Sequence, residues 1–300
     1  YYLRYMDNNN EQEFCSKEAE EFWGPVDLYV GGAEHAVLHL LYSRFWHKVL
    51  FDLGLVSTKE PFKKLVNTGL IMAEDGVKMS KSLGNVVNPD EMIEKFGADS
   101  LRVYEMFMGP FEQSKAWNEK TLSGTRKFLD RVWRVFEKPV TDKENKDLLP
   151  VLHKTIKVVS EHIDDFKFNT AIAQMMVLVN ELTALKEVPR NVLEDFAVLL
   201  APFAPHLAEE FWKNLGHKGT IAFVAWPKYD ESLLVEDSVK YAVQVNGKLR
   251  ADFEISKDAL KEEAIAMAKS LDSVQKWIDG KEIVKEIFVP GKIVGFVVRD

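Results

Sequence analysis

Apolar residues recur at helical spacing over most of the chain between residues 116 and 216. One stripe consists of Phe128, Val132, Val135 and Phe136. Residues 169–185 and 192–215 continue the pattern, and residues three or four apart share one face of a helix. Pro202 and Pro205 must kink or break the last helix. The pattern therefore predicts an α-helical bundle.

The period changes from helical to alternating in the last sixty residues. The alternating apolar positions are Tyr241, Val243, Val245, Leu249, Ala251, Phe253 and Ile255. Asn246-Gly247 interrupts this run and is a strong signal for a tight hairpin turn. A charged helix over residues 257–279 and a second hairpin around Pro290-Gly291 complete a predicted ββαββ domain.

The N-terminal quarter of the chain shows the pattern of a parallel α/β unit. Residues 26–30 form a short apolar run that we expect to be a buried strand ending at a Gly31-Gly32 turn. A helix should follow from Ala36 to Val49 and end at Gly54. Residues 66–75 resemble a strand that runs into a turn. A helix should begin at Asn88-Pro89 and end near Gly97.

Length and charge narrow the possible classes of protein. The chain has 300 residues, which suggests two or three domains, and its net charge is 39 − 47 = −8. Such an acidic protein binds nucleic acid only through a local basic face.

Cys15 is the single cysteine, which excludes an intrachain disulfide and fits a cytoplasmic protein. We expect neither a membrane span nor a signal peptide, and the absence of an initiator Met suggests a piece of a longer protein.

The loop of residues 78–82, Lys-Met-Ser-Lys-Ser, is the sharpest candidate for chemistry. Its lysines could neutralise negative charge on a phosphorus centre or on a leaving pyrophosphate, and its serines could donate hydrogen bonds. The spacing is not that of a P-loop. An exposed polar loop without a ligand is the structural alternative.

A second candidate is the segment from Gly31 to His39. Its glycines would allow a nucleotide to approach the backbone, and Glu34 could accept hydrogen bonds from the ribose hydroxyls. His35 and His39 would share a helix face. A metal site of Glu34, His35 and His39 is possible, although the order differs from H-E-x-x-H. A helix cap with half-buried histidines is also possible, and the spacing alone leaves these alternatives open.

Taken together, these motifs resemble the leucyl-tRNA synthetase family of class I aminoacyl-tRNA synthetases. Lys-Met-Ser-Lys-Ser is the signature loop of that class, and residues 27–47 resemble the leucyl version of the adenylate site. Residues 88–102 resemble the helix after the loop, and residues 168–171 and 200–212 resemble the helical tRNA-binding domain. The resemblance covers nearly the whole chain. The other class signature, His-x-Gly-His, is absent from it.

The resemblance implies the fold and its division along the chain. We expect a multidomain α/β plus all-α protein: the C-terminal half of a Rossmann-type catalytic domain, a helical tRNA-binding bundle and a small ββαββ domain. The expected segments are the Rossmann half (1–75), the signature loop with a stem-contact region (76–115), the helical domain (116–236) and the C-terminal α+β domain (237–300).

The resemblance also implies roles for individual residues. Lys78 and Lys81 would be catalytic, and Tyr29 and His39 would bind leucine. ATP or the adenylate would be bound by Gly31, Gly32, Glu34, His35, Met79, Ser80, Lys81 and Ser82. Candidate tRNA contacts are Arg126, Lys127, Arg131, Arg134, Lys248 and Arg250. We expect no resident metal.

The expected partners follow from the same resemblance. They are leucine, ATP with Mg²⁺, tRNA(Leu) and the N-terminal half of the same enzyme, with neither a membrane nor DNA. The chain alone should be nearly inactive, because half of the adenylation site would be missing. A non-catalytic tRNA-binding module, a subunit of a split synthetase and a metal hydrolase built on Glu34, His35 and His39 remain alternatives.

Overall fold

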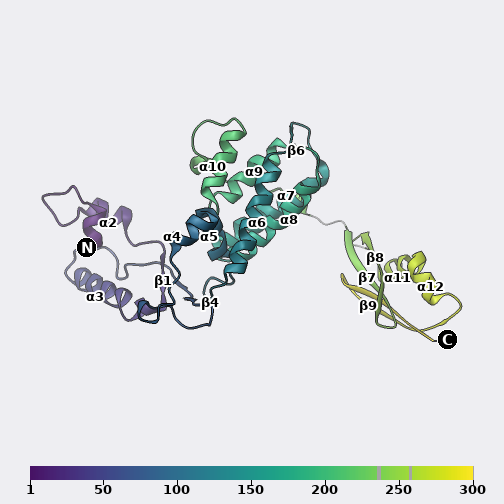
Figure 1. The fold of residues 1–300 in the computed structure, drawn as a ribbon. Helices are drawn as coiled ribbons and strands as arrows, with labels where there is room; N and C mark the ends of the chain where they lie inside the picture. The colour runs from purple at the N-terminus through teal and green to yellow at the C-terminus, as the bar shows by residue number, and fades with distance from the viewer. Residues whose placement is uncertain (235–237, 257–258, 300) are drawn as a thin grey trace. The chain divides into compact units, whose positions relative to one another are not determined.

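The computed structural model describes residues 1–234, 238–256 and 259–299. These residues form two compact units, each described here by itself (Figure 1). The first unit comprises Tyr1–Glu144 and Thr155–Pro227, and the second comprises Asn145–Lys154 and Lys228–Asp300. Mixed α/β structure is therefore confirmed, while the predicted division into four segments stays a prediction.

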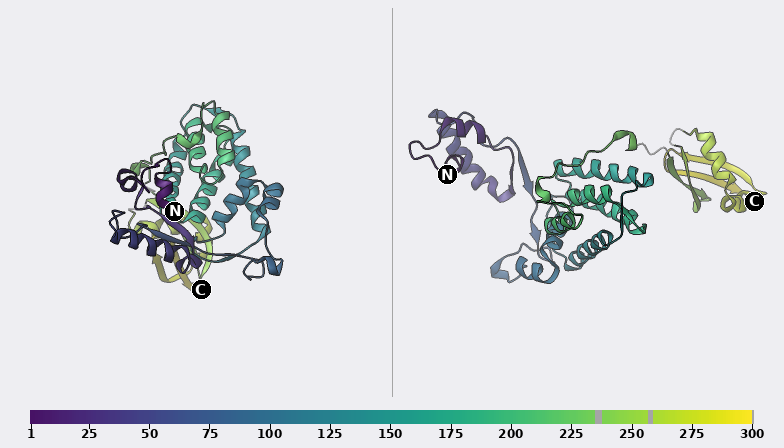
Figure 2. Two further views of the ribbon diagram at one scale, coloured as in Figure 1. Left: turned by 90° about the vertical axis from the view of Figure 1, so that its left-hand side faces the viewer. Right: turned by 90° about the horizontal axis from the view of Figure 1, so that it is seen from above.

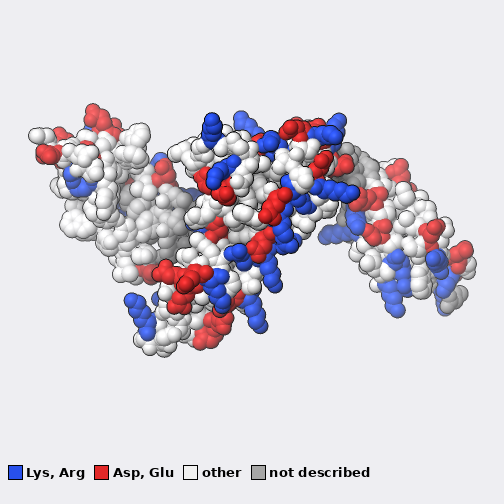
Figure 3. Space-filling model, turned by 45° about the horizontal axis from the view of Figure 1, so that its top comes forward, with Lys and Arg blue, Asp and Glu red and all other residues white. Residues whose placement is uncertain are grey.

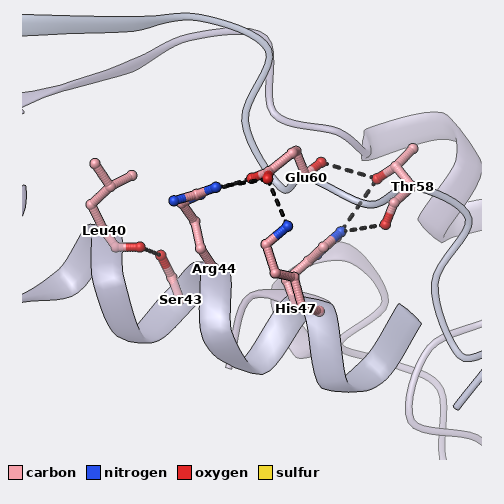
Figure 4. A network of polar contacts seen from close by, with 7 residues as sticks. Leu40, Ser43, Arg44, His47, Thr58 and Glu60 are labelled. Atoms are coloured by element: carbon pink, nitrogen blue, oxygen red, sulfur yellow. Dashed lines mark hydrogen bonds and ion pairs between the residues drawn. The ribbon is translucent and has the colours of Figure 1, made fainter. Parts of the chain in front are cut away.

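The first unit opens with short helices and one pair of parallel strands. Its elements are α1 (Tyr2–Met6), α2 (Lys17–Trp23), β1 (Tyr29–Gly32), the 3₁₀ helix η1 (Ala33–Ala36), α3 (His39–Asp52) and β2 (Leu65–Thr68). In the β1–β2 pair, Tyr29 lies opposite Leu65 and Gly32 opposite Thr68. Glu60, in the loop between α3 and β2, holds that loop against α3, because its carboxylate binds Arg44 and Lys48 at 2.7 Å each (Figure 4).

Two predictions for this segment are wrong in detail. Gly31 and Gly32 do not form the turn after the strand, because both lie inside β1. His35 and His39 do not share one helix face either. His35 lies in η1, while His39 is the first residue of α3, and the backbone at Leu38 is not helical (φ −115°, ψ −110°). The strand continues through both glycines because Gly31 and Gly32 pair with Asn67 and Thr68 of β2. The helix can therefore begin only after them.

A hairpin-like loop and two helices follow. The elements are β3 (Ile71–Met72), the 3₁₀ helix η2 (Lys81–Leu83), α4 (Pro89–Phe96), α5 (Ala98–Phe107) and β4 (Lys115–Ala116). The predicted helix start is confirmed, since the Asn88 side chain accepts a hydrogen bond from the Asp90 amide and Pro89 occupies the first turn. Gly97 ends α4 at φ +89°, a conformation that glycine adopts without strain.

The predicted helices between residues 116 and 216 are present. They are α6 (Glu119–Phe136), α7 (Leu149–Asp164), α8 (Phe168–Ala184), α9 (Arg190–Leu200) and α10 (Pro205–Asn214). The short elements among and after them are β5 (Val140–Thr141), η3 (Lys146–Leu148), β6 (Val188–Pro189) and η4 (Ile221–Phe223). In the first unit α5, α6 and α8 pack on one another, and α9 packs on α10 (Figure 2). As expected, the Pro202–Pro205 segment separates α9 from α10.

The second unit contains a four-stranded sheet. Its elements are η5 (Glu231–Leu234), β7 (Ser238–Val245), β8 (Lys248–Ser256), α11 (Lys261–Ser270), α12 (Asp272–Ile278), β9 (Glu282–Val289) and β10 (Ile293–Arg299). The strand order is β8-β7-β10-β9, with β7 and β10 parallel. Apolar residues of α11 and α12 pack with those of the strands in one core.

Both predicted hairpins are confirmed, with Asn246 at φ +49° and Gly247 at φ +75° in the first turn. The single helix predicted over 257–279 is two helices, because the backbone at Leu271 is extended. Its first two residues, 257–258, lie outside the described residues, as does the predicted boundary at 236–237.

The surface charge and the length of the helices bear on possible partners. Lys and Arg are interspersed with Asp and Glu over the helical part of the face drawn in Figure 3. In the described part of the chain, every helix is too short or too polar to cross a membrane.

Candidate active site

The centre of the first candidate site is the imidazole of His39, at the start of α3. The Tyr29 hydroxyl lies 2.8 Å from Nδ1 of His39, and the two rings stack with an interplanar angle of 9°. The Tyr1 hydroxyl bonds the other ring nitrogen, Nε2. Tyr42, one turn further along α3, meets His39 edge to face. We call Tyr1, Tyr29, His39 and Tyr42 the tyrosine–histidine cluster.

The protons on the two hydroxyls and on the imidazole determine what this cluster can donate to a ligand. Burial raises the pKa of Tyr1 and that of Tyr29, so both hydroxyls keep their protons at neutral pH. A neutral imidazole has one N–H donor and one acceptor nitrogen. In that form of His39 one tyrosine donates to the ring and the other accepts from it, which leaves the second hydroxyl proton available to a ligand. The cluster can thus offer a hydrogen-bond donor to a carboxylate or carbonyl oxygen.

A parallel arrangement lies deeper in the same segment and is structural. The buried His47 has Nε2 at 2.7 Å from the carbonyl oxygen of Thr58, so that nitrogen carries the proton (Figure 4). The Tyr2 hydroxyl must then donate to Nδ1 of His47. Burial raises the pKa of Tyr2 to about 12, which keeps that donor protonated. This pair fixes α1 against α3 and so places Tyr1 beside His39.

The glycines next to the cluster keep space for the Glu34 side chain. A Cβ atom on Gly32 would lie 2.2 Å from Oε2 of Glu34, so any other residue at this position would displace the carboxylate. Nδ1 of His35 is buried and makes no hydrogen bond with the described residues. Gly31, Gly32, Glu34 and His35 therefore adjoin the cluster through β1 and η1, and the His35 ring meets that of His39 edge to face. Their binding of a nucleotide stays a prediction.

The second candidate site is the loop of residues 78–82. A short β-bridge joins Met72 to Lys78, and the Ala73 amide donates to the carbonyl oxygen of Val77 at 2.8 Å. Met79 packs against a core that includes Tyr104 and Trp117. The Ser80 hydroxyl lies 3.1 Å from that of Ser82 and caps η2. Lys78 and Lys81 are exposed, so the loop presents both ammonium groups to solvent from an anchored backbone.

The two candidate sites stand on separate supports. The cluster rests on β1 and the start of α3, whereas the loop rests on β3 and α4. Their joint action on one ligand stays a prediction. The metal alternative has no geometric support, because no three His, Cys, Asp or Glu residues are arranged to hold a metal within residues 1–234, 238–256 and 259–299.

The basic residues predicted to contact RNA differ in how they are held. Arg126 donates to Asp130 at 2.8 Å and to the carbonyl oxygen of Phe96 at 3.0 Å. Arg131 donates to Asn180, and Arg134 to the backbone of Asp130. Lys127 is exposed. These arginines thus have structural bonds that compete with any RNA contact.

In the second unit, Lys248 is exposed and Arg250 is stacked. The guanidinium of Arg250 lies 3.5 Å above the ring centre of Trp277, a cation–π contact. Its Nε atom is buried without a hydrogen-bond partner among the described residues. Arg250 therefore presents a flat, rigid cationic surface beside the β7–β8 turn, whereas Lys248 is a solvated charge.

Sequence reasoning missed three residues of these sites. Tyr1 reaches His39 across 38 positions, and no local pattern links them. Tyr42 was visible at i+3 from His39, a spacing that places both on one helix face. Asn85 lies just after the signature loop, and its side chain bonds the Ser80 amide at 2.8 Å.

Comparison with known proteins shows what the two halves of the chain are similar to. Residues 7–118 match the class I tRNA synthetases (I, L, M and V), and residues 145–265 match the anticodon-binding domain of tRNA ligase. Leucine–tRNA ligases from two strains of Leptospira biflexa serovar Patoc are each 53% identical to it over 305 aligned positions. The alignment covers 99% of this chain but spans only 35% of those relatives' length.

A solved structure agrees. The crystal structure of the ternary complex of Agrobacterium radiobacter K84 agnB2 LeuRS, tRNA and LeuAMS matches this chain with a TM-score of 0.72 and 32% identity. That match covers 100% of this chain and 42% of the other. The chain is therefore a homologue of part of the leucine–tRNA ligases, and its residues 7–118 are similar to the class I tRNA synthetases.

Proposed function

We propose that this chain is part of a leucine–tRNA ligase and supplies one half of its adenylation site. In the complete enzyme a carboxylate oxygen of leucine attacks the α-phosphorus of ATP. Leucyl-adenylate forms and pyrophosphate leaves. The ribose hydroxyl at the end of tRNA(Leu) then attacks the leucyl carbonyl carbon, an ester forms and AMP leaves. The observation that carries this proposal is the anchored loop with exposed Lys78 and Lys81, in a chain 53% identical to leucine–tRNA ligases.

The tyrosine–histidine cluster suits the recognition of leucine. Its free hydroxyl proton can bind an oxygen of the amino acid, and the nearly parallel rings of Tyr29 and His39 hold that hydroxyl in place. Gly32 and Glu34 would hold the ribose of ATP, with His35 beside them. The role of this segment is orientation, since a bound pair of reactants reacts far faster than a free pair.

The loop suits the stabilisation of charge on the phosphates. Lys78 and Lys81 would neutralise the departing pyrophosphate, and Ser80, Ser82 and the backbone at Met79 would add hydrogen bonds. Mg²⁺ would enter with ATP as its counter-ion. The remainder of the enzyme would supply the other half of the site, and the helical bundle and C-terminal unit would contact tRNA, with Lys127, Lys248 and the stacked Arg250 as contacts.

Leucine-dependent exchange of radioactive pyrophosphate into ATP tests this function. The chain is assayed alone and then mixed with the remaining segments of a leucine–tRNA ligase. We expect activity only in the mixture, and a loss of at least 100-fold in Lys81→Ala. Lys143→Ala removes an exposed lysine far along the chain and serves as the matched control. Activity that survives Lys81→Ala would contradict the proposed role of the loop.

A mixture without activity would favour a second function, a tRNA-binding module without catalysis. Binding to leucine tRNA would then be measured at several salt concentrations. Binding through phosphates weakens steeply as salt rises, whereas affinity that is independent of salt would exclude the basic residues as the contact surface.

A further inference from the structure

Asn85 lies three residues after the signature loop and contacts its backbone. The chain is anchored to one core before and after this contact, by Met79 within the loop and by Val87 beyond Asn85. Between these anchors the backbone makes two short-range bonds of its own, from Leu83 to Ser80 and from Gly84 to Lys81. Asn85 is half-buried, whereas Lys81 and Ser82 are exposed.

The side-chain amide of Asn85 joins the two sides of the loop. Its Oδ1 atom accepts a hydrogen bond from the Ser80 amide at 2.8 Å, and its Nδ2 atom donates to the carbonyl oxygen of Lys78 at 3.4 Å. One of these backbone groups belongs to Lys78, and the other belongs to the residue that precedes Lys81. The amide thus holds the backbone beside both lysines.

The backbone between them makes this contact possible. Gly84 adopts φ +64°, the left-handed conformation that reverses the chain and brings Asn85 back towards Ser80. The Ser80 hydroxyl meanwhile caps η2 through the Leu83 amide at 3.3 Å. The Ser80 residue is therefore held on both sides, its amide by Asn85 and its hydroxyl by η2.

We infer that Asn85 is a positioning residue for Lys78 and Lys81, acting through the loop backbone and not through contact with the substrates. This inference rests on the proposed function. A displacement of about 1 Å of a catalytic group lowers a rate by about 100-fold. A side chain that fixes the loop in advance therefore affects the chemical step more than it affects the binding of leucine.

The first test replaces the amide in the reassembled enzyme. Asn85→Ala removes both bonds, and Asn85→Gln keeps the amide but moves it by one methylene. We expect both variants to lower kcat for pyrophosphate exchange by about 10- to 100-fold, with KM for leucine within twofold of the original value. A purely structural role would lower the amount of folded protein and leave kcat per folded molecule unchanged.

Asn88→Ala is the matched control. Asn88 lies three residues further on and caps α4 through the Asp90 amide. Its loss should lower the thermal stability slightly and leave kcat unchanged. If Asn85→Ala retains full kcat, or if Asn88→Ala lowers kcat equally, the inference is overturned.

A second measurement does not depend on catalysis. Amide hydrogen exchange is followed in this chain alone, with and without Asn85→Ala. We expect the Ser80 amide to exchange at least tenfold faster in the variant, while the amides of α4 are unchanged. Equal exchange at Ser80 would overturn the inference even if the enzyme is active. Faster exchange at Ser80, together with no activity of the reassembled enzyme, would support the positioning role of Asn85 in the loop and separately contradict the proposed function.

Discussion

Asp99 on α5 caps the N-terminus of α10 and simultaneously binds the side chain of His206. One carboxylate oxygen lies 2.7 Å from Nδ1 of His206, and the other accepts a hydrogen bond from the Leu207 amide at 2.8 Å. Asp99 is buried, whereas the side chain of His206 is 73% exposed. This contact joins residue 99 to a segment more than a hundred positions away, and Arg102 reinforces it through the carbonyl oxygen of Pro202.

The two partners should therefore contribute unequally to stability. Asp99→Ala leaves the first amides of α10 without an acceptor and should lower the free energy of unfolding by about 2–4 kcal/mol. His206→Ala removes an exposed partner and should cost less than about 1 kcal/mol. Urea denaturation of both variants measures the difference, and equal losses would show that the side-chain contact with His206 matters more than the cap.

Lys138 gives a second prediction, because its ammonium group lies at the end of α8. Its Nζ atom donates to the carbonyl oxygens of Leu182, Thr183 and Leu185. Lys138→Met should lower the free energy of unfolding by about 1–3 kcal/mol, since these carbonyls lose their donor. Lys127→Met, on an exposed part of α6, should change it by less than about 0.5 kcal/mol. Thermal unfolding compares the two, and a similar effect of both substitutions would contradict the capping role.

Asp195 on α9 predicts a dependence of stability on pH. Burial, together with the nearby carboxylate of Glu194, raises its pKa to about 6. The native protein therefore holds this proton more tightly than the unfolded chain does. Stability from this group is complete below about pH 4 and declines as pH rises through 6, because the native carboxylate must then ionise.

Asp195→Asn should remove this decline. We expect the variant to be more stable than the original chain at pH 7 by about 1 kcal/mol, a value reduced because the carboxyl group is partly solvated. At pH 4 the two proteins should be equally stable. Denaturant titrations between pH 4 and 8 measure the difference, and a constant difference over this range would exclude Asp195 as the titrating group.

The tyrosine–histidine cluster gives a fourth prediction. Tyr1→Phe and Tyr29→Phe each leave one nitrogen of His39 without its hydroxyl partner, and each should raise KM for leucine by about tenfold in the reassembled enzyme. Tyr42→Phe keeps the ring contact with His39 and should have no such effect. Steady-state pyrophosphate exchange at varied leucine gives these values, and a tenfold effect of Tyr42→Phe would assign a role to the Tyr42 hydroxyl and contradict this account of the cluster.

Local sequence signals determined many elements of this chain. Asn246-Gly247 forms the expected hairpin turn because both residues tolerate the positive φ that such a turn requires. Asn88 and Pro89 begin α4, and Gly97 ends it, through interactions within one turn of helix. The signature loop could be recognised for the same reason, since its residues are contiguous.

Tertiary packing decided the rest. Gly31 and Gly32 lie in a strand because β2 offers them a partner, and turn propensity is too weak to oppose that pairing. Tyr1 meets His39 because the folded chain holds α1 beside α3, where Tyr2 also contacts His47. Arg126 and Arg131 are candidate tRNA contacts in the sequence, yet in the folded chain their guanidinium groups bind Asp130 and Asn180. Spacing along the chain fixes which residues share one face of a helix or strand. Only the folded chain decides which distant polar groups become hydrogen-bond partners.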